Sequence, residues 1–153
     1  MRGLSAIHCF MCVIICVIFP SLVIAGGEPI GSIKTVEGQA YVVREGDAIP
    51  ATVGARIFKN DTLKTSEGGA LGAVFRDNTT ISLGPRTEVV LDEFIFAPDQ
   101  AKFSMITRMI KGSAAYLSGL ISKLSPGSAR VETPVGVVGF RGTKCLISIA
   151  GGQ

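Results

Sequence analysis

The sequence has no tryptophan, and it has only one histidine, His8, and four cysteines. His8 and three of the cysteines belong to an N-terminal segment that we expect to be removed. The remaining chain then has one thiol, Cys145, and cannot form an internal disulfide. The loss of His8 also excludes Ser-His-Asp, Cys-His and histidine-metal sites. Without tryptophan, the scattered aromatic residues give little support for carbohydrate binding.

The N-terminal segment has the pattern of an export signal. Arg2 precedes an apolar run at Cys9–Phe19, which Pro20 interrupts. The run is shorter than the roughly 18–20 residues that a membrane-spanning helix needs, and small residues follow it. We predict that residues 1–25 are a signal peptide cleaved after Ala25. The product is expected to be periplasmic or secreted, with no stable membrane span after cleavage.

The charge balance excludes some partners. The formal net charge is +3, and it falls to +2 when Arg2 is removed. Basic residues lie singly between acidic ones, so the sequence lacks the basic stripe of a nucleic-acid surface, and we expect no nucleic-acid partner. We divide the rest of the chain into a short linker at 26–30, one β domain at 31–149 and a tail at 150–153.

Short strand-like segments separated by turn residues recur along this domain. This pattern predicts an all-β fold, either sandwich-like or a short β-roll or solenoid. The clearest unit is a hairpin of Leu71–Arg76 and Thr79–Leu83, because each segment alternates apolar and polar or small residues. Asp77 and Asn78 form its turn, since both tolerate left-handed backbone conformations.

Other segments are placed in the same way. A hairpin is expected from Ser32–Val36 and Gln39–Arg44, and a further strand-like piece at Thr52–Ala55. Lys102–Ile110 alternates as a strand, although Met105 and Met109 also fit one helical face; an expected turn at Lys111-Gly112 favours the strand. Apolar residues then recur at helical spacing, which predicts one short helix near 117–124.

The stretch Val131–Ile149 is predicted to organise the domain. Its first half, up to Phe140, has apolar or small residues at every position from Val135, so both faces are expected to be covered. In its second half, Cys145 alternates with two isoleucines, which predicts a buried and unreactive thiol.

Few residues qualify as a functional site, and we predict no catalytic residue, no cofactor and no metal. Asp92 and Glu93 are neighbours in a strand, so they point to opposite faces and do not converge for catalysis. The candidate interaction or closing-turn residues are Arg141, Gly142 and Thr143, together with Asp77 and Asn78. An arginine at a turn binds an anion on a partner or holds backbone carbonyls; we favour the second role, because no other anion-binding group adjoins it.

Several ordered fragments resemble the FecR-domain family, and together they cover approximately Gly31–Ile149. In chain order the fragments are Gly31-Ser32-Ile33, Val36-Glu37-Gly38, Val53-Gly54-Ala55, Asn60 to Thr65, Ala73 to Leu83, and Glu132 to Thr143. One departure is Asn78, which stands where the family usually has glycine after the hairpin aspartate.

The resemblance implies an all-β module on the outer side of the bacterial inner membrane. In signalling members it implies a sensor that relays a ferric-siderophore signal from an outer-membrane transporter to a sigma factor. This sequence shows neither the sigma-binding segment nor the transporter-contacting domain of those members. We therefore expect a non-catalytic interaction module that binds an envelope protein or polymer; one form of this function is an accessory to envelope signalling. The alternatives are a structural protein associated with cell wall or polysaccharide and, less favoured, a cell-wall-acting enzyme.

Overall fold

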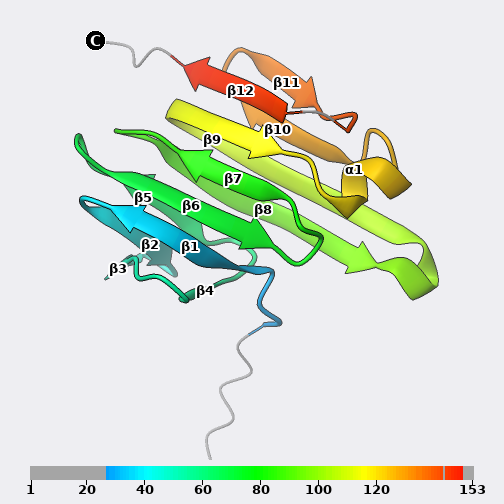
Figure 1. Cartoon of the computed structure of the whole chain (residues 1–153), viewed down its shortest axis with the longest axis horizontal. Helices are drawn as coiled ribbons and strands as arrows, with labels where there is room; N and C mark the ends of the chain where they lie inside the picture. The colour runs from blue at the N-terminus through cyan, green and yellow to red at the C-terminus, as the bar shows by residue number, and fades with distance from the viewer. Residues whose placement is uncertain (1–26, 143, 150–153) are drawn as a thin grey trace, which may run out of the picture.

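The computed structural model describes residues 27–142 and 144–149. The predicted signal peptide with its cleavage site, the predicted tail at 150–153 and Thr143 lie outside these residues. The described chain forms one curled, mostly antiparallel sheet whose two halves face each other as a half-barrel (Figure 1). The predicted all-β class is confirmed.

Each half of the sheet has its own strand order. The front half in Figure 1 runs β4-β1-β6-β7-β9-β12, and the rear half runs β3-β2-β5-β8-β9-β10-β11. The front strands are β1 (Gly31–Glu37), β4 (Arg56–Ile57), β6 (Ala70–Phe75), β7 (Thr80–Leu83) and β12 (Lys144–Ile149). The rear strands are β2 (Ala40–Arg44), β3 (Asp47–Pro50), β5 (Thr62–Thr65), β8 (Glu88–Ala97), β10 (Ala129–Thr133) and β11 (Gly136–Gly139). The remaining elements are β9 (Lys102–Leu117), the 3-10 helix η1 (Pro98–Gln100) and the helix α1 (Leu120–Leu124).

Strand β9 belongs to both halves and organises the molecule. Its first part pairs with β8 and β10, and its last part pairs with β7 and β12. The strand passes from one half to the other around Gly112, whose φ is 94°. A Cβ there would lie 2.3 Å from Oγ1 of Thr87, so both the backbone and the space require glycine. The expectation that Val131–Ile149 organises the domain is therefore wrong.

The core follows the alternation in the sequence. The inward residues of the predicted hairpin are buried, and its register pairs Leu71 with Leu83. In β8 the alternation shifts by one residue between Leu91 and Glu93, so Leu91 and Phe94 are both buried. Removing these side chains from water is the main favourable contribution to folding.

The two halves also meet through polar and aromatic contacts. The hydroxyl of Thr107, on the rear part of β9, lies 3.0 Å from the hydroxyl of Tyr116, on its front part. The ring of Phe140 stacks on Tyr116 with 5.0 Å between centroids. Phe140 thereby fills the interior beside β12 and β11, the two terminal strands of the sheet.

Two predicted strand arrangements are wrong. β1 and β2 do not form a hairpin: β1 pairs with β4 and β6, whereas β2 pairs with β3 and β5. The chain changes halves between them, and the carbonyl of Gln39 accepts hydrogen bonds from the backbone and hydroxyl of Ser66 instead. Residues 52–55 form a turn rather than a strand.

The last third of the chain also differs from its prediction in detail. The short helix is present, but it begins at Leu120, because Leu117 still pairs with Thr80 and Lys144 in the sheet. The stretch after Thr133 is not covered on both faces. Val135 is 89% exposed and Val137 is 64% exposed, since β11 has one neighbouring strand and no second layer over it.

Candidate functional site

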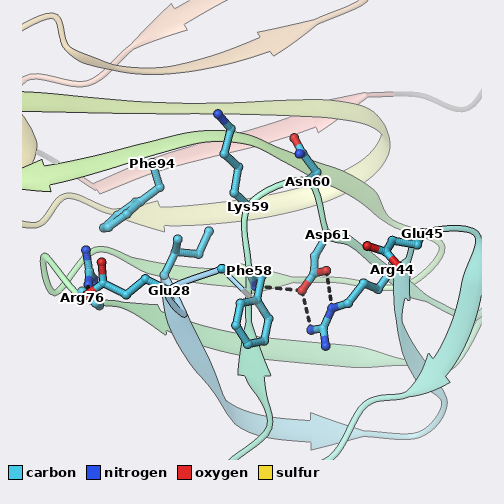
Figure 2. A pocket seen from close by; sticks show the side chains of 11 residues that line it. Glu28, Arg44, Glu45, Phe58, Lys59, Asn60, Asp61, Arg76 and Phe94 are labelled. Carbon is cyan, nitrogen blue, oxygen red and sulfur yellow. Dashed lines mark hydrogen bonds and ion pairs between the residues drawn. The ribbon is translucent and has the colours of Figure 1, made fainter. Parts of the chain in front are cut away.

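A hollow of about 570 Å³ lies beside the segment that enters β1, where the β4–β5 turn meets β2 and β8 (Figure 2). Its walls combine aromatic rings with charged side chains. The residues that matter for its chemistry are Glu28, Arg44, Phe58, Lys59, Asp61, Arg76 and Phe94.

One wall of the hollow is built on a buried carboxylate. Asp61 is 1% exposed and accepts hydrogen bonds from Arg44 Nε and Nη2, both at 2.8 Å. It also accepts the backbone N–H of Phe58 at 2.8 Å, and the guanidinium lies 4.4 Å from the centre of the Phe58 ring. The hydrogen bonds that Arg44 donates to Asp61 raise the pKa of Arg44 above its ordinary value. These contacts satisfy both charges within the protein.

The other wall is arranged in the same way. Arg76 forms an ion pair with Glu28 and lies 5.9 Å from the centre of the Phe94 ring. Phe94 in turn stacks on Phe75 with 5.7 Å between centroids. Each arginine of the hollow is therefore paired with a carboxylate, whereas Lys59 and Glu45, which also line it, have no ion pair among the described residues.

The predicted residues Asp77 and Asn78 lie in the β6–β7 turn. Asn78 has a φ of 65°, the left-handed conformation expected there. Asp77 is 0% exposed, and its carboxylate accepts hydrogen bonds from the backbone and hydroxyl of Thr79 and from the backbone N–H of Ile121. Its carbonyl accepts the N–H of Leu120 at 2.7 Å. Asp77 thus anchors the start of α1 and is unavailable to a partner.

The other predicted group, Arg141 and Gly142, lies in the link from β11 to β12. Both residues are exposed, Gly142 has a φ of 72°, and Thr143 lies outside the described residues. Among the ion pairs of the described residues, none includes Arg141. Both groups lie at the end of the front half where Leu117 pairs with Thr80 and with Lys144. Asp77 is buried and Arg141 is exposed, and no ion pair of the described residues joins them.

The remaining polar candidates have separate partners. Asp92 accepts two hydrogen bonds from Arg108, whose pKa this contact raises, whereas Glu93 accepts one from the hydroxyl of Ser104. Cys145 is half-buried against the core, less enclosed than predicted. The described residues include no group of three potential metal ligands, and no helix among them is long and apolar enough to cross a membrane.

The feature that sequence reasoning missed is the open edge of β11, which we define as Val135–Gly139. Arg130 of β10 lies opposite Gly139 of β11, so the next residues along the two strands, Ala129 and Phe140, are also opposite each other. The N–H of Phe140 donates to the carbonyl of Ala129 at 3.0 Å, which makes them a hydrogen-bonded pair. Because such pairs alternate along antiparallel strands, Val137 and Gly139 direct their N–H and C=O groups away from β10. The absence of charge from Val135 to Gly139 was the available sequence signal.

Comparison with known proteins gives one match. The family model described as FecR protein matches residues 61–153, which is more than half of the chain. Neither the curated proteins nor the solved structures gave a match. The matched range includes β5 through β12 and thus β9, which joins the two halves of the sheet. The chain therefore belongs to the FecR family.

Proposed function

We propose that the chain is a non-catalytic binding module that acts in the periplasm or as a secreted protein, as an accessory to envelope signalling. Membership of the FecR family suggests a function related to envelope signalling and not a known enzymatic one. The proposed location rests on the export signal predicted for residues 1–25.

The observation that carries the proposal is the contrast between the interior and the open edge of β11. Every buried side-chain nitrogen and oxygen of the described residues has a hydrogen-bond partner within the protein. The partners of the buried carboxylates Asp61 and Asp77 are backbone N–H groups and the side chains of Arg44 and Thr79, so these contacts hold the fold together. At the open edge of β11, by contrast, apolar side chains are exposed and outward backbone groups have no neighbouring strand.

Export is tested by fusing alkaline phosphatase after Gln153 in the full chain. The enzyme folds only where its disulfides form, outside the cytoplasm. We expect phosphatase activity from intact cells and loss of that activity when residues 2–25 are deleted. An inactive fusion that is present at a normal level would contradict the proposed location.

Binding is tested by placing a photo-cross-linking amino acid at four exposed apolar positions of the full chain in its native host. The positions are Ile49, Val53, Val135 and Leu146, which lie on different parts of the surface. We expect a protein adduct from at least one position. Adducts only with polysaccharide, or no adduct at any position, would contradict a protein-binding module. As control substitutions on β8, Asp92→Asn and Glu93→Gln are expected to leave the adducts unchanged.

A further inference from the structure

The edge of β11 lacks the protection that other edges of this sheet have. Natural edge strands avoid pairing with other chains by being short or by carrying charges or proline. Strand β3 has Asp47 and Pro50, and β4 has only two residues, one of them Arg56. Strand β12 begins with Lys144. Strand β11 has four residues, as β3 does, but none of them is charged and none is proline.

An added strand would find both backbone and side-chain contacts at this edge. Val137 and Gly139 have outward N–H and C=O groups two residues apart, which is the spacing with which an antiparallel strand forms hydrogen bonds. On one face the added side chains would meet Val137, and on the other they would meet Val138, which packs against the core. Main-chain pairing of this kind supplies affinity, and alternate side chains supply specificity.

The charge around the edge identifies the kind of partner. From Ala101 to Ile149 the chain has seven basic residues and one acidic residue, Glu132, which lies opposite Val137. Two of the basic residues form ion pairs, Arg108 with Asp92 and Arg130 with Glu132. Arg141 and Lys144, just after β11, are exposed and have no ion pair among the described residues. This excess of positive charge attracts an acidic segment. It disfavours pairing with a second copy, which would bring two basic regions together.

An anionic membrane surface would also be attracted by this positive charge, but it would not pair the outward backbone groups of β11. Outward N–H and C=O groups that enter an apolar medium lose their hydrogen bonds to water and gain none in return, which is strongly unfavourable. An extended peptide pairs these groups instead. The polar edge therefore favours a polypeptide over a lipid.

We propose that an extended, acidic segment of a partner protein adds to β11 as a further strand of the rear half of the sheet. This inference rests on the proposed binding function and specifies its surface and the chemistry of its partner. Arg141 contributes to it as a positive charge at the end of the added strand.

The test uses the full chain in its native host with the photo-cross-linker at Val135. Val137→Pro removes one outward N–H while leaving the pairing of β10 and β11 intact, and Val137→Thr keeps that N–H. We expect an adduct whose cross-linked peptide has a net negative charge. Val137→Pro should lower its yield about tenfold, the effect of losing roughly one hydrogen bond, whereas Val137→Thr should lower it less than twofold. Arg141→Glu should also reduce the yield.

The other outcomes separate this inference from the proposed function. Adducts at Ile49 or Val53 but none at Val135 would overturn strand addition and leave a binding module. A dimer of the chain, a lipid adduct or a protein adduct that persists in the Val137→Pro variant would also overturn it. Unchanged resistance of this variant to proteolysis establishes that it is folded. If the Val137→Pro variant is not folded, hydrogen exchange in the unsubstituted chain replaces it as the test. The cross-linked segment is added as a synthetic peptide, and we expect the amide hydrogen of Val137 to exchange slowly. Fast exchange would overturn the inference.

Discussion

At the scale of single residues, the carboxylate of Asp61 is the charged group most removed from water in an ion pair of the described chain. Its partner Arg44 keeps 36% of its side chain exposed, so the pair joins the interior to the surface. Burying a carboxylate is tolerable here because three hydrogen bonds compensate for the lost water. The pair therefore fixes the wall of the hollow rather than offering a charge to a ligand.

Asp61→Ala is expected to lower the free energy of unfolding by about 2–4 kcal/mol, because it leaves the N–H of Phe58 and the guanidinium of Arg44 without this partner. Urea unfolding followed by circular dichroism measures the change. The matched control is Asp92→Ala, which breaks the exposed pair with Arg108 and should shift the midpoint little. Equal shifts for the two variants would contradict the role given to burial.

The hydroxyl of Tyr116 makes stability depend on pH in alkali. Burial raises the pKa of Tyr116 above its ordinary value near 10, although the hydrogen bond with Thr107 acts in the opposite direction. The unfolded chain ionises first, so the contribution is complete below about pH 10 and is lost as the pH rises toward the folded pKa.

We expect this residue to contribute a slope of about 1.4 kcal/mol per pH unit to the fall in stability above pH 10. Tyr116→Phe should remove that part of the slope, and Tyr41→Phe, which leaves Tyr116 in place, serves as the control. The measurement is the urea midpoint of each variant at several pH values above 10, from which the slope of stability against pH is obtained. If the slopes of the two variants were the same, the buried hydroxyl would not be their cause.

At the scale of elements, α1 depends on a turn far away in the sequence. The helix has five residues, too few to be stable alone, and no basic residue but Lys123 in its last turn. Its first N–H groups are satisfied by Asp77, and the N–H of Gly119 donates to Oγ1 of Thr79. The β6–β7 turn and α1 are therefore one structural unit.

Gly119→Ala should separate the two parts of this unit. A Cβ at this position would lie 2.3 Å from the carbonyl oxygen of Asp77 and from the N–H nitrogen of Thr79, both of them backbone atoms. We expect a loss of about 1–3 kcal/mol in the free energy of unfolding. Gly68→Ala is the control, since no atom lies within 4 Å of its Cβ position. Equal stability of the two variants would argue against the close contact.

At the scale of the whole molecule, β9 makes the two halves of the sheet interdependent. Neither half is complete without it, because β7 and β12 pair with one part of the strand and β8 and β10 with the other. The front and rear halves should therefore unfold together.

The two tyrosines of the sequence allow a direct test. In Tyr41→Phe the remaining tyrosine, Tyr116, reports on the front half, and in Tyr116→Phe the remaining Tyr41 reports on β2 in the rear half. In each variant, the urea transition by tyrosine fluorescence should coincide with the transition by circular dichroism. A fluorescence transition that departs from the circular dichroism transition in either variant would show that the halves unfold separately.

The sequence by itself determined the fold class, most strands and the β6–β7 hairpin. These features depend on alternation with a period of two residues and on turn residues such as Asn78. Both signals lie within a few neighbouring residues of the sequence. The inward face of Met105 and Met109 was predictable for the same reason.

Only the tertiary structure decided which strands pair and which surfaces stay open. β1 and β2 each have the pattern of a hairpin strand, but their partners lie farther along the chain. The valines of β11 have the composition of a covered strand, yet exposure depends on how many neighbours a strand has, which no local pattern records. The anchoring of α1 by Asp77 likewise joins residues more than forty positions apart. Pairing and burial are set by contacts between distant segments, and those contacts place the candidate binding edge at β11.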